Sequence, residues 1–108
     1  MNKIEIDVGV YTSIEVDLSG FDWVDVKKVV LTIRNYYAPD YPIVFEKEFE
    51  PTDTNIHEVV IDPELSTKIK NGAKYDFDKI MMDGKRYKAS DVGEIVLNRK
   101  VGEAKNGD

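Results

Sequence analysis

Apolar and polar residues alternate along the first part of the chain. Residues 3–8 alternate charged and aliphatic side chains, and residues 13–18 repeat the pattern. Neighbouring side chains of a β-strand point to opposite faces, so this period of two predicts two strands, each with one face on a core and one in water. Ser19-Gly20 interrupts the second alternation and predicts a turn.

The middle of the chain continues in the same style. Residues 27–35 are rich in β-branched residues, and residues 56–61 form another short apolar run. Residues 43–50 alternate again, but Lys47 interrupts the apolar face. An inward charge favours an edge strand or a β-bulge, and the sequence leaves both open. Residues 51–55 have the composition of a turn.

One segment carries helical signals. Asp62 can cap free N–H groups, Pro63 suits the first helical position, and Gly72 suits the left-handed position after the last one. Leu65 and Ile69 would share one side. The pattern predicts a short helix over about residues 63–71.

A stretch near the end, KYDFDKIMMDGKRYKASDVGEIVL, changes its apolar phase. Tyr75 and Phe77 share one strand face, whereas Ile80 and Met82 share the other. This predicts a bulge near residues 78–79, unless both faces of the strand are covered there.

Asp83-Gly84 lies between two strand-like segments and predicts a two-residue type I′ hairpin turn. Such a turn would pair Met82 with Lys85, Ile80 with Tyr87 and Lys79 with Lys88. Residues 91–101 then predict the last strand.

Seven or eight short strands separated by turns, with one short helix, are typical of an antiparallel immunoglobulin-like β-sandwich. The cysteine–tryptophan–cysteine hallmark of true immunoglobulin domains is absent, because the chain has no cysteine. We expect a single all-β domain over residues 1–101, followed by a polar tail over residues 102–108.

Composition narrows the classes of partner. The 108 residues include 15 Lys and Arg against 21 Asp and Glu, a net charge of −6. Nucleic acids and anionic membranes require clustered basic residues, so we expect neither as a partner. No apolar run approaches the roughly 20 residues of a membrane span, and the N-terminus lacks a signal-peptide core. We therefore expect a protein that begins near Met1 and is not exported by a standard signal.

The sequence offers little catalytic chemistry. His57 is the only histidine, and no serine or cysteine nucleophile lies at a recognisable spacing from it. Asp76, Asp78 and Asp83 do not match a calcium-loop spacing, although Asp76 and Asp78 would share a strand face where a weak cation site is the alternative interpretation. No glycine-rich phosphate loop is present. We expect no enzyme activity and no cofactor.

Aromatic residues gather in predicted loops. Phe21 and Trp23 are best explained as caps on the end of a sandwich. Tyr36, Tyr37 and Tyr41 lie in a loop that contains two prolines. They form the candidate surface for a protein partner or a stacked sugar ring, and a cap on the end of the sandwich explains them equally well.

Most of the chain resembles a known family, with residues 13–18 and 29–34 resembling its opening strands and the main motifs lying in the second half. The motifs follow one another in a fixed order: a helical turn, Gly72, the Tyr75-Asp76-Phe77-Asp78 strand, the Asp83-Gly84 hairpin and a closing strand from Gly93. This order is similar to that of the immunoglobulin-like N-terminal domain of phage baseplate upper proteins. That family is a structural part of phage tails, so no catalytic residue carries over. The resemblance implies a virion protein, assembled in the host cytoplasm, whose partners are other tail or baseplate proteins or further copies of itself. The alternative is a carbohydrate-binding sandwich that uses the loop tyrosines.

Overall fold

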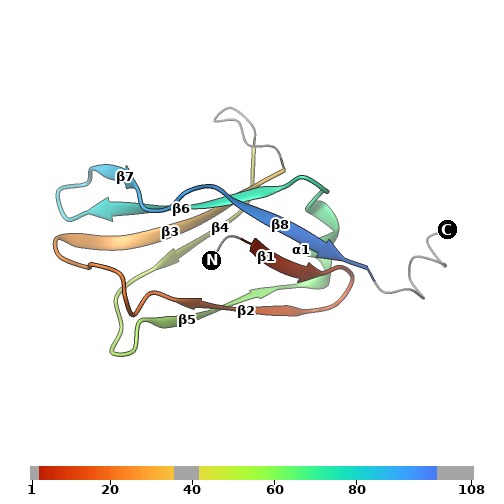
Figure 1. The fold of residues 1–108 in the computed structure, drawn as a ribbon, viewed down its shortest axis with the longest axis horizontal. Coiled ribbons are helices and arrows are strands. Elements are labelled where there is room, and N and C mark those ends of the chain that lie inside the picture. The colour runs from red at the N-terminus through yellow and green to blue at the C-terminus, as the bar shows by residue number, and fades with distance from the viewer. Residues whose placement is uncertain (1–2, 36–41, 100–108) are drawn as a thin grey trace.

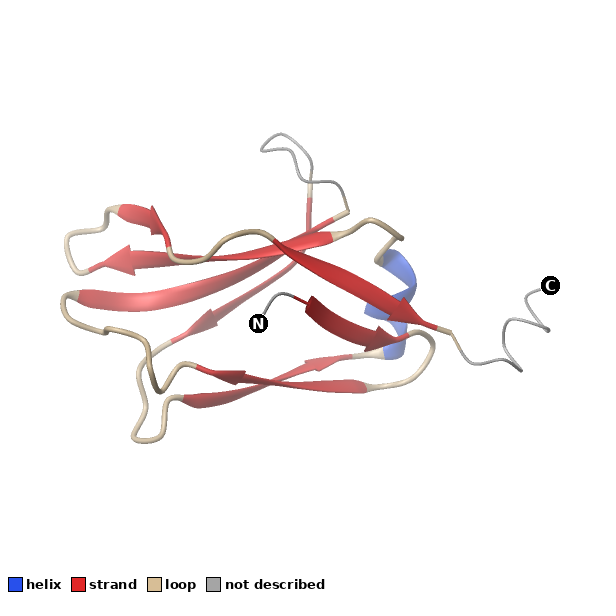
Figure 2. Cartoon of the chain, in the orientation of Figure 1, coloured by secondary structure: helices blue, strands red, loops and turns tan. Residues whose placement is uncertain are grey.

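The computed structural model describes residues 3–35 and 42–99 and shows two stacked β-sheets with one short helix at their side (Figures 1 and 2). The elements, in chain order, are β1 (Lys3–Asp7), β2 (Thr12–Asp17), β3 (Val26–Arg34), β4 (Ile43–Phe49), β5 (Ile56–Ile61), α1 (Pro63–Lys68), β6 (Lys74–Met81), β7 (Arg86–Lys88) and β8 (Gly93–Asn98).

The larger sheet has the strand order β1-β8-β6-β3-β4, and β7 pairs with β6 beside this path. The smaller sheet contains β2 and β5 alone among the described residues. Every pairing is antiparallel except one, because β1 runs parallel to β8. The described strand pairs are thus antiparallel as predicted, apart from this one. The cause is topological, since β1 reaches the sheet edge beside the last strand and not beside its sequence neighbour β2.

The core lies between the two sheets. Its members are the inward residues that the period of two selects, among them Ile4 and Ile6 of β1, Val16 of β2, and Leu31 and Ile33 of β3. Their burial supplies most of the favourable free energy of such a fold. Phe21 and Trp23 pack against this core from the loop between β2 and β3, which agrees with their interpretation as end caps.

The edge position predicted from Lys47 is confirmed. β4 ends the strand order of the larger sheet, and Lys47 pairs with the core residue Leu31 yet remains exposed. The register of β4 also shifts opposite Ile33 and Arg34. β4 is thus an edge strand and also carries a register shift, the two alternatives that the sequence left open.

The helix is shorter than predicted. Asp62 is its N-cap and its carboxylate accepts from Leu65 N at 2.7 Å, as expected. The helix ends at Lys68, however, because Ile69 turns to an extended conformation and buries its side chain in the core. Gly72 does adopt a positive φ of 90°, but in the turn that follows, where Ala73 N donates to Lys70 O.

The final hairpin differs from the predicted one by one residue. Met81 N donates to Lys85 O, and Lys79 pairs with Tyr87, so the loop contains Met82, Asp83 and Gly84. Gly84 has a φ of 89°, and Asp83 does not adopt a positive φ. This is a three-residue loop closed by a left-handed glycine, which also suits the twist of a hairpin.

The predicted bulge at residues 78–79 is wrong. The β3–β6 register is regular there, and its shift lies between Val26 and Lys28 of β3. Tyr75, Phe77 and Met81 lie on the face of β6 that meets the core, while Ile80 on the other face is half-buried. The change of face in the apolar pattern of the sequence arises only because Lys79 interrupts the inner face. β6 is therefore partly covered on both faces, which was the alternative to a bulge.

Candidate functional site

The predicted binding tyrosines, Tyr36, Tyr37 and Tyr41, lie outside the described residues. Their role as a partner-binding or sugar-binding surface stays a prediction. Asp83 and Gly84 form the tip of the β6–β7 hairpin, at the left end of the molecule in Figure 1.

The acidic pair of β6 lies on the outer face of the larger sheet among basic residues. Arg86 Nε donates to Asp78 Oδ2 at 2.6 Å, and Lys88 is the cross-strand partner of Asp78. Burial and the neighbouring carboxylate of Asp78 raise the pKa of Asp76. In the described ranges, no three His, Cys, Asp or Glu residues gather to hold a metal ion. The guanidinium of Arg86 therefore forms an ion pair with Asp78. This arrangement does not support the alternative of a cation site.

His57 occupies the inner face of β5 opposite Val16. Its ring lies 5.0 Å from that of Phe49, and its buried Nε2 has no hydrogen-bond partner among the described residues. The ring is half-buried, and the contact observed for it is packing on a phenylalanine.

The candidate site lies at one end of the sandwich, and the β2–β3 loop forms one side of it. Phe21 N donates to Leu18 O at 3.1 Å, and Phe21 and Trp23 meet edge to face with ring centroids 5.0 Å apart. Trp23 O accepts from Val26 N, closing a second turn in which Asp25 has a φ of 60°. This anchored turn leaves Val24 facing water.

The β6–β7 hairpin builds the other side. Met82 N donates to Asp25 O at 2.8 Å, which ties the hairpin to the β2–β3 loop. Between them is a hollow of about 310 Å³, lined by Asp25, Met81, Met82, Asp83 and Tyr87. Two loops distant in sequence thus form one surface.

This surface exposes three large apolar side chains. Val24 is 71% exposed, Met82 68% and Tyr87 49%. We call these three residues the loop-end patch. Apolar side chains grouped around a hollow and rimmed by charge are typical of a protein-binding surface, and Met and Tyr are both common in such interfaces. Other large exposed apolar residues, such as Tyr11 and Ile43, lie on separate elements.

Sequence reasoning missed the loop-end patch. Its signal was present, because Val24 is an aliphatic residue flanked by loop residues and Met82 precedes Asp83-Gly84 in a turn. Nothing in the local pattern shows that these two turns meet, since their contact depends on the pairing of β3 with β6.

The comparisons with known proteins concern the fold. No protein-family model matches the chain, and no curated protein matches it. Among solved structures, it is similar to the immunoglobulin-like domain of mouse leukocyte-associated immunoglobulin-like receptor 1, described as a strand-swapped dimer. The identity is 19%, the match covers 91% of this chain and 90% of that one, and the TM-score is 0.51.

A structure of the same receptor's extracellular domain, also a strand-swapped dimer, matches at 20% identity over 93% of this chain and 83% of that one, with a TM-score of 0.47. The fold is an immunoglobulin-like β-sandwich. The predicted fold class is thereby confirmed, with one short helix and eight strands in the described residues. None of the helices in this described part is long and apolar enough to cross a membrane.

Proposed function

We propose that this chain is a non-catalytic docking module, and that the loop-end patch is the surface that binds another protein. The exposure of Met82 and Tyr87 at one hollow, with the exposed Val24 next in sequence to its lining residue Asp25, is the observation on which the proposal rests. A stable contact would cover about 800 Å² of each partner, so the patch would form the centre of a larger footprint.

Fold-level analogy supports this choice of surface. In immunoglobulin variable domains the loops at one end of the sandwich form the binding surface. The loop-end patch likewise combines the β2–β3 loop with the chain that leaves β6, both at the left end of Figure 1. Analogy of fold raises the plausibility of the surface and says nothing of the partner.

The partner that we propose is a neighbouring protein of a phage or prophage tail or baseplate, within a virion assembled in the host cytoplasm. This part rests on the resemblance of residues 65–97 to the baseplate upper protein domain. Self-association is included in the proposal, since no strand of the described ranges pairs with the outer edge of β5. The strand-swapped receptor domain shares the fold with this chain, and at 19% identity its dimer is a property of that receptor alone.

The test uses assembled particles. The labelled chain is produced with the tail genes of a phage that encodes it, and purified virions are probed for it. We expect wild-type chain in the particles and loss of incorporation for Met82→Glu and for Tyr87→Ala. Val60→Glu, at an exposed site on the smaller sheet, is the matched control and is expected to enter normally. Wild-type chain absent from purified particles would contradict the assignment.

Sugar binding through Tyr36, Tyr37 and Tyr41 predicts different results. It requires calorimetric binding of host cell-wall glycans that Tyr37→Ala abolishes and Met82→Glu leaves intact. Glycan binding with that dependence would replace the docking proposal for this chain.

A further inference from the structure

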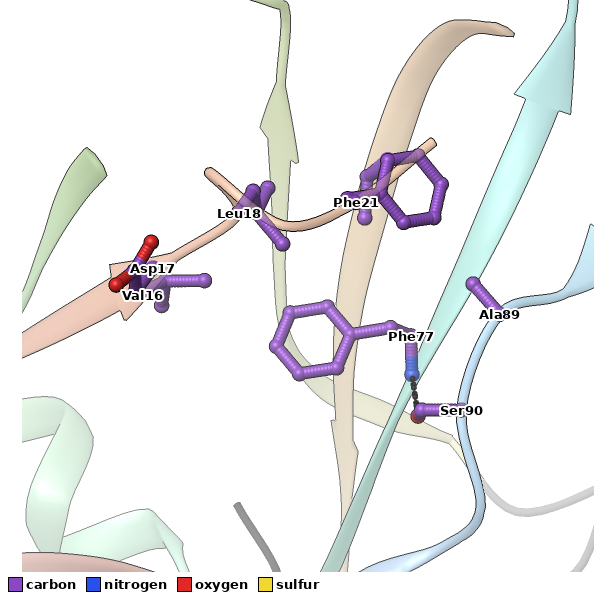
Figure 3. Close-up of a pocket in the computed structure, with 8 residues that line it drawn as sticks. Val16, Asp17, Leu18, Phe21, Phe77, Ala89 and Ser90 are labelled. Atoms are coloured by element: carbon purple, nitrogen blue, oxygen red, sulfur yellow. Dashed lines mark hydrogen bonds between the residues drawn. The ribbon is translucent and has the colours of Figure 1, made fainter. Parts of the chain in front are cut away.

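A second hollow, which shares no lining residue with the first, lies between the sheets (Figure 3). Its volume is about 200 Å³, and its walls include Val16 and Leu18 on one side and Phe77 on the other. Figure 3 shows the rings of Phe21 and Phe77 bordering the space, with Ala89 and Ser90 at its rim. Small-molecule sites usually measure about 300–1,000 Å³, so this hollow suits one large apolar side chain better than a whole ligand.

The far wall of the hollow is rigidly held. Ala89 N donates to Phe77 O at 2.8 Å, and Phe77 N donates to Ser90 Oγ at 3.0 Å. These bonds fix the segment after β7 against β6. Val16 and Asp17 of β2 and the following Leu18 all line the hollow, so it adjoins the C-terminal end of β2.

The edge of β2 at this opening has unused backbone groups. Leu18 N donates to Asn55 O, so residues 16 and 18 direct their backbone groups toward β5. By the alternation of an antiparallel ladder, Glu15 and Asp17 direct theirs toward the opposite edge. No strand of the described ranges pairs with that edge. An extended chain could add there as a further strand, a common mode of peptide recognition.

Charge selects the kind of chain that would fit. The open edge carries the exposed carboxylates of Glu15 and Asp17, and Asp91 follows the rim residue Ser90. Hydrogen bonds from the Ser19 hydroxyl and backbone N–H lower the pKa of Asp17, so this rim residue is ionised at neutral pH. A second copy adding through its own β2 would place like charges opposite one another, which is unfavourable.

We propose that the free edge of β2 and the adjoining hollow bind an extended peptide segment of a partner, with one large apolar side chain in the hollow and basic residues beside it. This interaction is separate from the loop-end patch and does not depend on the proposed function.

The test is a titration with a defined probe. The probe is a short capped peptide in which lysine alternates with valine around one central phenylalanine. Trp23 is the only tryptophan and packs on Phe21, which lines the hollow, so its fluorescence reports binding directly. We expect saturable binding, weakened by about tenfold or more when alanine replaces the phenylalanine or glutamate replaces the lysines.

Two pairs of protein variants locate the site. Ala89→Phe fills the hollow, and Val60→Phe adds the same ring to the outer face of β5. Glu15→Pro removes a backbone N–H from the free edge of β2 and leaves the hydrogen bonds between β2 and β5 intact. Its control is Glu58→Pro, which removes a backbone N–H from the outer edge of β5, at the residue paired with Glu15. We expect Ala89→Phe and Glu15→Pro to weaken binding by about tenfold or more, and the two controls to bind as wild type does.

Circular dichroism checks that each variant folds, and Ala89→Phe alone decides the question if either proline variant unfolds. No binding of the phenylalanine peptide at millimolar concentration would overturn the proposal. Equal losses in a variant and its control would also overturn it. Sedimentation that shows a dimer which Glu15→Pro dissolves would assign the edge to a second copy and end the peptide proposal.

Discussion

Gly93 lies beneath the ring of Tyr75, its partner in the β6–β8 ladder. A Cβ at this position would overlap the Tyr75 ring, which is buried and cannot easily move away. We predict that Gly93→Ala destabilises the protein by about 1–3 kcal/mol, the usual cost of an overpacked core. Denaturant unfolding measures the change in the free energy of unfolding.

Gly20 provides the matched control for this prediction. A Cβ there meets no atom within 4 Å, and Gly20 has no positive φ. Gly20→Ala is therefore expected to leave stability unchanged or slightly higher. If both variants lost the same free energy, the contact with Tyr75 would not be the cause.

Asp76 is the residue whose ionisation opposes folding. Burial, then the charge of Asp78, raises its pKa, so the folded state holds its proton at pH values where the unfolded state has released it. Stability from this group is complete below the unfolded pKa and is lost as the pH rises through the folded pKa. This carboxyl is partly exposed, so solvent screens the effect. Asp76→Asn should therefore stabilise the protein only slightly at pH 7, by at most about 0.5 kcal/mol, and give no gain near pH 3.

Denaturant unfolding of wild type and Asp76→Asn across this pH range measures the effect. Asp53→Asn, in an exposed turn, serves as the control and should show no such pH-dependent gain. A gain from Asp76→Asn that persists unchanged at low pH would point to packing and not to charge.

At the scale of elements, the register of the β6–β7 hairpin is the sharpest difference between sequence and structure. Asp78 pairs with Lys88 at a non-hydrogen-bonded position, because Lys79–Tyr87 and Phe77–Ala89 are the hydrogen-bonded neighbours. Such positions bring Cα atoms within disulfide reach. We predict that Asp78→Cys with Lys88→Cys oxidises readily to an intramolecular disulfide in this otherwise cysteine-free chain.

The control combines Lys79→Cys with Lys88→Cys, the pair that a two-residue turn would place opposite each other. In the observed register these side chains point to opposite faces, so we expect little intramolecular disulfide. Mass spectrometry after mild oxidation compares the two variants. Preferential oxidation of the control pair would restore the two-residue turn.

Local patterns predicted the strands well and their ends poorly. The period of two predicted residues 56–61 to the residue, because alternation follows directly from burial of one face. Its interruption at Lys47 indicated an edge strand or a bulge, and β4 is an edge strand. The helix end and the hairpin register depend on competing tertiary contacts. Ile69 leaves the helix to enter the core, and a left-handed Gly84 closes a three-residue loop as well as a two-residue one.

At the scale of the whole molecule, the sequence could not predict which distant segments meet. The parallel β1–β8 pair joins the two ends of the described chain, and the hydrogen bond from Met82 to Asp25 joins the two loops of the loop-end patch. Each depends on strand order, which alternation does not encode. A binding surface made of neighbouring loops is therefore visible only once the sheet topology is known.

One core shared by both sheets should unfold as one unit. Ile6 of β1 and Ile61 of β5 come from different sheets and are both fully buried in the same cluster. We predict that Ile6→Ala costs about 2–5 kcal/mol, and that it shifts the unfolding curves seen by Trp23 fluorescence and by circular dichroism together. Trp23 lies in the β2–β3 loop, outside β1, so it would not respond to a merely local loss of that strand.

Val60→Ala, at an exposed site, should shift neither curve appreciably. Separate transitions for the two probes would mean that β1 and the larger sheet unfold independently of the β2–β5 pair, and that the free edge of β2 belongs to a weakly attached layer.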